Sequence, residues 1–467
     1  MSSKYKTLFS NTIIFAIGNI LVKFIGFFLL PIYTTYLTTG DYGLSELIVK
    51  SLDVAIPIGT LSIVDALYRF SIDKDADYKK LLSSSLNVIL KGFVIIVVIA
   101  SIYYYYTNFE YTFEFVLLFL VSSLQKLFAQ FARGIGDSKK FVASGIINSI
   151  VMAIANIILI VILRQGINGY LYSLIISFSI AAAYSFLSSK AYLYISFQNV
   201  DKKTMYALLA FSLPNIPNML SWWINSLSSQ YIIGGYVSLG AAGMFAAASK
   251  LPSLINLFSN VFQQAWQYST AKEIDTDDGT SFFSKTFKYY VSLGSILTSV
   301  VIIIVPYLSL IILKGDFYKA WIYVPFLLIS ALFGSFSIFL GTFYNAVKKN
   351  MMAMVSTVTG AFVSLLISFI FIPQIGIFGA VLASVISYFI VFIFRIIDTR
   401  RFVKLKINYI NLSLNILILL IQAYFITFDK NLNLLISSLS FLSIILINYN
   451  ILLDLIKNIL KLIKNKI

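Results

Sequence analysis

The chain contains no cysteine and no histidine among its 467 residues. The lack of cysteine excludes disulfides, thiol nucleophiles and thiolate metal ligands. The lack of histidine excludes every mechanism that needs an imidazole as acid, base or metal ligand. The phosphate-binding pattern G-x-x-x-x-G-K-[ST] is also absent, so no ATP-binding loop of that kind is expected. We therefore expect no cofactor.

Charged residues are scarce as well, at 12% of the chain against about 25% in ordinary soluble domains. Hydrophobic residues make up 59%, and the mean hydropathy is +0.89. This composition indicates an integral membrane protein, because a helix needs about 20 apolar residues to cross a bilayer. The apolar runs predict an all-α, polytopic fold with about 14 transmembrane helices. They lie near residues 12–36, 44–68, 84–106, 113–132, 141–163, 168–189, 205–233, 241–266, 287–313, 320–344, 351–372, 376–397, 408–428 and 432–456.

The Lys and Arg residues behind the net charge of +16 are concentrated in the predicted loops and tails, a distribution that does not indicate a nucleic-acid-binding patch. If the N-terminus lies inside, most Lys and Arg residues fall in inner loops and tails. Only Arg164, Lys314, Lys319 and Lys430 then fall in outer loops. This positive-inside bias predicts that both termini are cytoplasmic. No nucleic-acid partner is expected.

An internal duplication divides most of the chain. Gly40, Gly43 and Lys50 recur 200 residues later as Gly240, Gly243 and Lys250, and Lys139, Gly166, Gly169 and Ser177 recur 210 residues later as Lys349, Gly376, Gly379 and Ser387. The duplication predicts two parallel-repeat six-helix bundles around a central cavity, with the substrate site at their interface. The expected domains are residues 1–190, a cytoplasmic linker 191–204, residues 205–400, and two additional helices with a basic tail over 401–467.

Four lysines, Lys23, Lys50, Lys126 and Lys250, lie inside predicted membrane spans. An unpaired ammonium group there costs at least about 2.5 to 3.5 kcal/mol. These lysines are therefore candidates for binding an anionic headgroup. The alternative, most relevant to Lys23, is pairing with a carboxylate from another helix.

Further charges accompany Lys50 in the second span. Glu46, Lys50 and Asp53 share one helix face, and Asp65 precedes Arg69 by four residues. One interpretation pairs Asp65 with Arg69 near the inner surface. The other makes Asp53 a protonatable or sodium-binding group that decides whether Lys50 is free to hold substrate. Candidates for ion coupling or gating are Asp53, Asp65, Arg69 and Arg133.

Amides recur at helical spacing in the seventh and eighth spans, with indoles next to those of the seventh, and Asn19 lies in the first span. Amides can donate and accept hydrogen bonds, and a ring face covers the C–H patch of a sugar. The alternative role is packing between helices. The candidate lumen residues are Asn19, Asn215, Asn218, Trp222, Asn225, Asn256, Asn260 and Gln264.

Several short motifs in this order and spacing resemble bacterial polysaccharide flippases of the O-antigen or teichoic acid exporter type, in the multidrug/oligosaccharidyl-lipid/polysaccharide exporter superfamily. The motifs are Leu30-Pro31, Asp41-Tyr42-Gly43, Tyr68-Arg69-Phe70, Phe131-Ala132-Arg133-Gly134, Ser212-Leu213-Pro214-Asn215-Ile216-Pro217, Gly243-Met244-Phe245, Gln264-Ala265-Trp266, Pro373-Gln374-Ile375-Gly376 and Gly379-Ala380. The resemblance implies two six-helix bundles around a V-shaped cavity, plus two more helices. It also implies a polyprenyl pyrophosphate-linked oligosaccharide as substrate. The chain departs from the family pattern at Ser229-Gln230, where such proteins often carry Asp-Arg.

These observations predict a flippase rather than an enzyme, located in the bacterial cytoplasmic membrane. It would move the lipid-linked glycan from the inner to the outer leaflet by alternating access, driven by an H⁺ or Na⁺ gradient or by the membrane potential. Expected partners are membrane lipids and a glycan polymerase or other biosynthesis proteins. One alternative is a multidrug or cation antiporter, which a cavity dominated by lysines would disfavour and a cavity dominated by Asp53 and Asp65 would favour. Another is a membrane-bound glycosyltransferase or polymerase, and the short outer loops argue against the polymerase.

Overall fold

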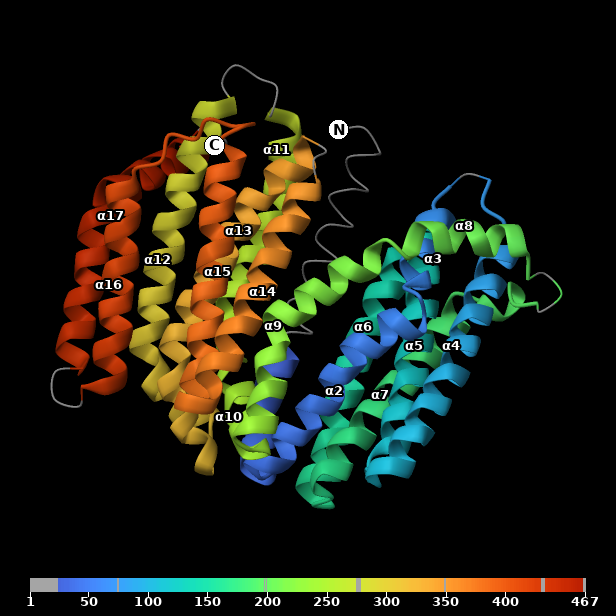
Figure 1. Ribbon diagram of the computed structural model, residues 1–467. Coiled ribbons are helices and arrows are strands. Elements are labelled where there is room, and N and C mark those ends of the chain that lie inside the picture. Colours follow the sequence, from blue (N-terminus) through green and yellow to red (C-terminus); the bar gives the residue numbers. More distant parts are fainter. Residues whose placement is uncertain are drawn as a thin grey trace. The chain divides into compact units, whose positions relative to one another are not determined.

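The computed structural model describes residues 24–73, 75–196, 198, 200–273, 279–347, 350–429 and 433–464. Within these ranges every regular element is a helix, which confirms the all-α prediction (Figure 1). Ten described helices are long and apolar enough to cross a membrane. An eleventh span results if α2 (Thr39–Gly59) and α3 (Ile63–Ser71), which bend by 61°, are counted together. The protein is therefore a multi-pass membrane protein.

The chain divides into two compact units, residues 1–223 and 224–467, and α9 (Asn215–Tyr236) contributes to both. Besides α2 and α3, unit 1 contains the helix Phe24–Tyr36, α4 (Tyr78–Thr107), α5 (Thr112–Gly134), α6 (Ser138–Asn156), η1 (Ile157–Ile162), α7 (Gly166–Ser188), η2 (Ala191–Leu193) and α8 (Lys202–Ser212). Unit 2 contains α10 (Leu239–Ala248), α11 (Ser253–Glu273), α12 (Gly279–Ile312), η4 (Gly315–Tyr323), α13 (Val324–Ala346), α14 (Asn350–Ile375), α15 (Ile377–Thr399), α16 (Tyr409–Phe428) and α17 (Asn433–Lys464). The domain limits proposed from the sequence remain predictions.

Besides the span expected at 44–68, which is broken between α2 and α3, two further predicted spans are interrupted. The span expected at 205–233 consists of α8 and α9, separated near Pro214. The span expected at 241–266 consists of α10 and α11, and the break between them ends at Pro252. Proline lacks a backbone N–H and disfavours helical geometry in the residue before it, so hydropathy alone cannot locate these ends. The span expected at 12–36 begins outside the described residues.

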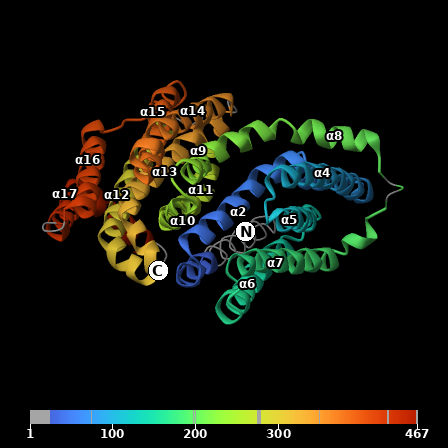
Figure 2. The same cartoon turned by 60° about the horizontal axis from the view of Figure 1, so that its bottom comes forward.

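Helix α8 packs against other helices of unit 1. Asp201 caps it by accepting hydrogen bonds from the Thr204 N–H at 2.9 Å and the Thr204 hydroxyl at 2.7 Å. Leu208 is fully buried in an apolar cluster that includes Leu67 and Phe131. The helix therefore lies across the ends of α3 and α4 (Figures 1 and 2).

The duplicated blocks repeat in local geometry. Gly166 begins α7, and Gly376 directly precedes α15. Their φ angles are +57° and +60°, values that suit glycine. A Cβ atom on Gly169 or Gly379 would lie 3.0 Å or less from the backbone of the preceding helix. The close helix pairs α6–α7 and α14–α15 thus depend on equivalent glycines.

The repeat differs at its two lysines. Lys50 lies within the continuous helix α2, which ends at Gly59. Leu61 and Ser62 follow with φ angles of +51° and +52°. Lys250 lies in the break between α10 and α11, immediately before Leu251 and Pro252. The two lysines therefore occupy different local structures.

Aromatic rings form much of the core of unit 2. Trp266 of α11 stacks on Phe339 of α13 with ring centroids 4.3 Å apart, and its indole N–H donates to the Phe339 carbonyl at 3.1 Å. The ring centroids of Phe262 and Tyr290 of α12 are 4.5 Å apart. These contacts hold the apolar side of α11 against α12 and α13.

Buried polar groups attach the two C-terminal helices to α12. The Ser299 hydroxyl donates to Gln422 Oε1 at 2.8 Å, and Gln422 Nε2 donates to Ser437 Oγ at 3.0 Å. Ser292 donates to Asn448, which itself donates to Asn415, at 2.7 and 2.8 Å. Since lipid tails give apolar helices no reason to associate, such interhelical hydrogen bonds fix α16 and α17 in place.

We predict that Gly92→Ala destabilises the protein. A Cβ atom on Gly92 would overlap the Gly59 carbonyl oxygen, so α2 and α4 would have to separate. Overpacking of this kind lowers the free energy of unfolding by about 1 to 3 kcal/mol. The measurement is thermal unfolding of the purified protein. Gly235→Ala is the control, because no atom lies within 4 Å of its added Cβ. Equal melting temperatures for both variants would contradict the predicted contact.

Candidate functional site

Two of the predicted lysines and two predicted carboxylates form a group in unit 1. Lys50 Nζ lies 3.6 Å from Asp53 Oδ2, and their side chains are 23% and 46% exposed. Lys126, on α5, has an exposed side chain and is attracted electrostatically to both Asp53 and Asp65. We call Lys50, Asp53, Asp65 and Lys126 the charge group. It gathers charges from α2, α3 and α5, and its net charge is zero when all four residues are ionised.

The first part of α9 borders the charge group within unit 1. The Trp223 indole N–H donates to the Lys50 carbonyl oxygen at 3.0 Å. The Ser62 hydroxyl lies 3.5 Å from Met219 Sδ. An indole therefore contacts the backbone of Lys50, and a thioether lies beside Ser62 at the break between α2 and α3.

The predicted pairing of Asp65 with Arg69 is wrong. Arg69 Nη1 instead contacts Asp73 Oδ1 at 2.8 Å, with both side chains about half exposed. Arg69 lies in the last turn of α3, so its long side chain reaches the aspartate that follows the helix. Asp65 interacts with Lys126. An exposed pair such as Arg69–Asp73 contributes about 0 to 1 kcal/mol.

Arg133 is held by aromatic rings. Its guanidinium carbon lies 4.3 Å from the centroid of Tyr68 and 5.3 Å from that of Phe141. Such cation–π contacts stabilise a charge where water is scarce. The gating roles suggested for Arg69 and Arg133 remain predictions.

Glu46 lies on the same face of α2 as Lys50 and Asp53, as predicted, but other helices cover its part of that face. Its side chain is 3% exposed and accepts a hydrogen bond from the Tyr170 hydroxyl of α7 at 3.2 Å. The sequence suggested its grouping with Lys50 and Asp53. The spacing of residues along α2 could not show that α7 covers this end of the face.

In unit 2, α11 presents the polar face that its sequence predicts. Asn256 is exposed and Asn260 partly exposed, while Phe262 and Trp266 pack into the unit on the opposite side. Lys250 is partly buried at the start of this face. The polar face is therefore available to a ligand, and its role in binding remains a prediction.

Some predicted residues fall outside the described structure. Asn19 and Lys23 precede its first residue. The backbone of Asn215, Asn218, Trp222, Asn225 and Gln264 is helical, but their side chains lie outside the described part.

The position at which the chain departs from the family pattern, Ser229-Gln230, carries no charge. Ser229 Oγ of α9 lies 2.9 Å from Ser368 Oγ of α14, and both serines are buried. A hydroxyl pair therefore joins these helices where an acidic residue would introduce charge.

Arg395 of α15 is a buried cation that the sequence analysis did not select. Only 4% of the residue is exposed, and it donates to the Ser337 carbonyl at 2.6 Å and to Ser356 Oγ at 2.9 Å. It thereby links α13, α14 and α15. It lies near the end of the span expected at 376–397, and residue spacing alone does not show which helices its side chain reaches.

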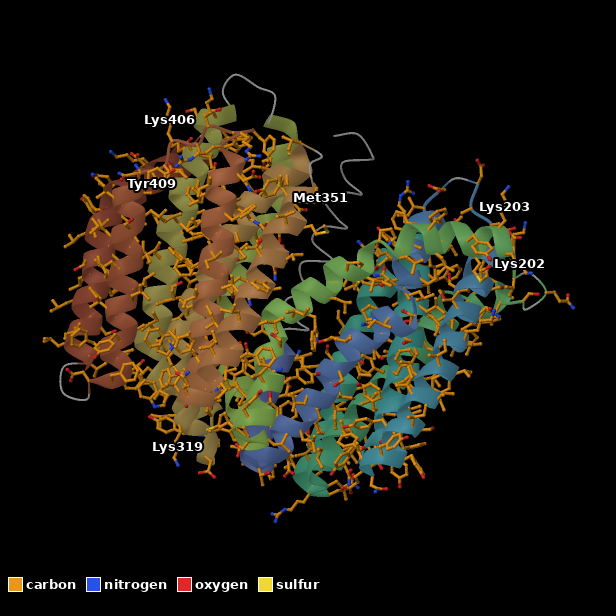
Figure 3. All side chains as sticks on the ribbon, viewed as in Figure 1. Lys202, Lys203, Lys319, Met351, Lys406 and Tyr409 are labelled. Carbon is orange, nitrogen blue, oxygen red and sulfur yellow. The ribbon has the colours of Figure 1, made fainter. Side chains whose placement is uncertain are left out.

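Charged side chains also mark the ends of each unit. Lys202 and Lys203 project from the beginning of α8 in unit 1, and Lys319 and Lys406 lie at opposite ends of unit 2 (Figure 3). This arrangement agrees with the predicted alternation of loops, whereas the orientation in the membrane remains a prediction. A cavity of about 610 Å³ between α3, α4 and α8 is lined by Asp73, Asp77, Lys80 and Lys203 among other residues, but by none of the predicted site residues.

The family model described as polysaccharide biosynthesis protein matches residues 8–267, more than half of the chain. The chain belongs to this family. Comparison with curated protein sequences gave no match. The family match includes all of the charge group and extends into α11 of unit 2.

Solved structures show that this family member has a transporter fold. The lipid II flippase MurJ in an inward closed conformation matches with a TM-score of 0.71 and 16% identity, over 94% of this chain and 100% of that chain. A mutant form of the Vibrio cholerae MATE transporter VcmN matches with a TM-score of 0.57 and 16% identity, over 86% and 98%. A MOP superfamily transporter from Pyrococcus furiosus matches with a TM-score of 0.52 and 13% identity, over 84% and 95%. These similar structures are transporters or flippases rather than enzymes.

We predict an energetic coupling between Lys126 and Asp65. Lys126→Met and Asp65→Asn should each destabilise the protein, and the double variant should lose less stability than the sum of the two. Coupled neighbours typically differ from additivity by about 0.5 to 3 kcal/mol. Thermal unfolding of the four proteins gives this coupling. Lys91→Met combined with Asp65→Asn is the control, since Lys91 has no ion partner among the described residues. Additivity in both cycles would refute the pairing.

Proposed function

We propose that the protein is a flippase that moves a polyprenyl pyrophosphate-linked oligosaccharide from the inner to the outer leaflet of the bacterial cytoplasmic membrane. The observation that carries this proposal is the charge group, in which Lys50 and Lys126 both interact with Asp53 inside a bundle of apolar helices. Family membership and the transporter fold support the same conclusion. The glycan would be carried across the membrane without being chemically changed.

The pyrophosphate group of such a lipid must lose water as it crosses. Lysine ammonium groups replace the stabilisation that water gives to the anion. Lys50 and Lys126 supply positive charge in unit 1, while Lys250 and the undescribed Lys23 are the further candidates. Because the cell interior is negative, outward movement of an anion also gains about 2.3 kcal/mol per charge per 100 mV.

Asp53 and Asp65 keep these lysines from being permanently occupied by an anion. In the absence of substrate they neutralise the ammonium groups, as the 3.6 Å contact between Lys50 and Asp53 illustrates. An arriving headgroup would compete with the carboxylates for the lysines. This exchange lowers the cost of the empty state and permits release, since a site that bound too tightly would not transport.

The glycan requires hydrogen-bonding groups rather than charge. Asn256, which is exposed, and Asn260, which is partly exposed, offer such groups on the open face of α11. Alternating access between the two repeated bundles would expose the site to each side in turn. Membrane lipids are partners in this scheme, and a glycan polymerase or other biosynthesis protein would receive the product.

Cation export is the second candidate. It is favoured by the two carboxylates of the charge group and by the fold shared with MATE multidrug transporters. A cationic drug would bind Asp53 and Asp65 and be repelled by the lysines. A pyrophosphate lipid would behave in the opposite way, so charge variants distinguish the two.

We predict that Lys126→Glu and Lys250→Glu each reduce lipid flipping at least about tenfold, equivalent to about 1.4 kcal/mol. Reversed charge repels the pyrophosphate, whereas insertion into the membrane should be retained. The assay measures, in proteoliposomes, how quickly a fluorescent pyrophosphate-linked oligosaccharide becomes accessible on the opposite face. Lys319→Glu is the control, because Lys319 is 79% exposed at the end of unit 2.

Parallel measurements with a cationic dye test the second candidate. Dye transport that persists while lipid flipping is absent from the unmodified protein would replace the flippase proposal. Unchanged flipping by both lysine variants would remove the lysines from the site.

A further inference from the structure

The C-terminal end of α4 carries exposed aromatic rings on every side. Tyr103, Tyr104, Tyr105 and Tyr106 are consecutive and are 53%, 51%, 79% and 78% exposed. Successive residues of an α-helix point about 100° apart, so four in a row surround the helix. Since none of the four rings is buried, this turn has no covered side in the described part of the chain. It lies at the end of unit 1 opposite α8, which the predicted topology places outside (Figure 1).

The rings continue into the loop that follows. The centroids of Tyr105 and Tyr106 are 5.4 Å apart. Phe109 lies 5.9 Å from Tyr103 and 5.9 Å from Tyr111, also measured between ring centroids. We call Tyr103–Tyr106, Phe109 and Tyr111 the aromatic tip. It is a connected group of rings on the hairpin between α4 and α5.

Hydrogen bonds hold the loop that carries the aromatic tip. The Asn108 N–H donates to the Tyr104 carbonyl at 2.8 Å, and Asn108 has a φ angle of +51°, a conformation that asparagine tolerates. The Thr112 hydroxyl donates to the Phe109 carbonyl at 2.7 Å. The rings are therefore presented by a short, hydrogen-bonded turn, which lowers the conformational entropy that a ligand would have to remove.

Carboxylates accompany the rings. Glu110 is exposed within the loop, and Glu114, in the first turn of α5, accepts a hydrogen bond from the Tyr172 hydroxyl of α7 at 3.3 Å. Tyr111 of the aromatic tip interacts electrostatically with Glu110, Glu114 and Asp41. This end of unit 1 thus combines aromatic rings with carboxylate oxygens.

The distribution of charge does not suit a lipid anchor. Tyrosines are common at membrane interfaces, but anionic headgroups attract lysine and arginine. The sequence has no basic residue between Lys91 and Lys126. Arg164 is the one basic residue of unit 1 that the predicted topology places at this end, where Asp41, Glu110 and Glu114 lie. Contact with lipid also needs rings on the lipid-facing side alone, whereas the four tyrosines surround the helix.

The duplicated half lacks this combination. Helix α12 takes the place of α4 in unit 2, because each lies between the two repeated blocks. The exposed residues at its C-terminal end include one tyrosine and two aliphatic residues, and two lysines follow: Tyr307, Leu310, Ile311, Lys314 and Lys319. Apolar residues followed by lysines are typical of a helix end at the membrane surface. The aromatic tip is therefore specific to unit 1.

We propose that the aromatic tip, together with Glu110, binds neutral sugar units of the glycan on the outer side of the membrane. This inference rests on the proposed function and assigns a receiving site for the glycan part of the transported lipid. Ring faces would cover the C–H patches of the sugars, and the carboxylate would accept hydrogen bonds from their hydroxyl groups. A neutral glycan is not repelled by the acids, unlike an anionic headgroup. Rings on several sides of the helix would hold more than one sugar unit.

The lack of cysteine allows a reporter to be placed beside the aromatic tip. Thr107→Cys adds a single thiol there, because Thr107 is exposed and its hydroxyl donates only to the Tyr103 carbonyl of its own helix. The thiol is coupled to an environment-sensitive dye, and the protein is placed in nanodiscs. The probe is the soluble oligosaccharide that mild acid releases from the polyprenyl-linked glycan of the same cells. We expect a saturable change in fluorescence. The control label is at Tyr206→Cys, a residue of α8 that is 68% exposed at the opposite end of unit 1, and it should not respond.

Variants then test the rings and the acid separately. The double variant Tyr105→Leu and Tyr106→Leu keeps an apolar surface but removes two rings, and it should weaken glycan binding at least about tenfold. Glu110→Gln should weaken it at least about fivefold, because a charged acceptor is lost. Tyr206→Leu is the matched control and should leave the affinity unchanged. Since these side chains are exposed, all the variants should keep the melting temperature of the unmodified protein.

Two results would overturn the proposal. One is an unchanged glycan affinity in the double variant. The other is a dye response that follows the phosphatidylglycerol content of the nanodisc and not the glycan, because it would assign the aromatic tip to the membrane surface.

The lipid-flipping assay separates this inference from the proposed function. If the unmodified protein flips the pyrophosphate-linked lipid but the labelled tip does not bind the oligosaccharide, only the receiving site is refuted. If the tip binds the oligosaccharide and no flipping occurs, the proposed function is refuted and the saccharide site remains.

Discussion

The cost of charge in a hydrocarbon environment determines which polar groups this fold can contain. Each must find a partner inside the protein or face water. Arg395 meets the requirement with the hydroxyl and carbonyl groups of neighbouring helices, and Arg133 with aromatic rings. Lys50 and Lys126 meet it with Asp53 and Asp65, but their side chains stay partly accessible. The arginines are thus satisfied by hydroxyl, carbonyl and aromatic groups, whereas the lysines proposed to bind substrate are paired with carboxylates.

Composition and periodicity were sufficient to predict the helical membrane fold, because a bilayer leaves few ways to satisfy the backbone. The neighbouring positions of Lys50 and Asp53 also followed from helical spacing. Contacts between distant segments did not. Asp65 interacts with Lys126 of α5 instead of Arg69, and Glu46 meets Tyr170 more than a hundred residues away. Pairings of this kind depend on how helices pack, which residue spacing within one helix does not encode.

The duplicated halves provide an internal comparison in place of an alignment. Equivalent glycines bring α6 to α7 and α14 to α15, so close packing was retained in both halves. Polar groups were not retained equally. Unit 1 contains a buried acid where unit 2 contains Ala246, and unit 2 joins Ser229 to Ser368 without charge. Two halves with one architecture have thus acquired different electrostatic properties, which suits a transporter whose halves perform different tasks.

The bend between α2 and α3 has an energetic consequence. Leu61 and Ser62 are adjacent non-glycine residues in left-handed conformations, which cost about 1 to 3 kcal/mol each. Contact of Gly59 with Gly92 and Phe119 fixes the geometry on one side of the bend. The elbow is therefore held at a cost in conformational energy, and it turns the short helix that carries Asp65 61° away from the direction of α2.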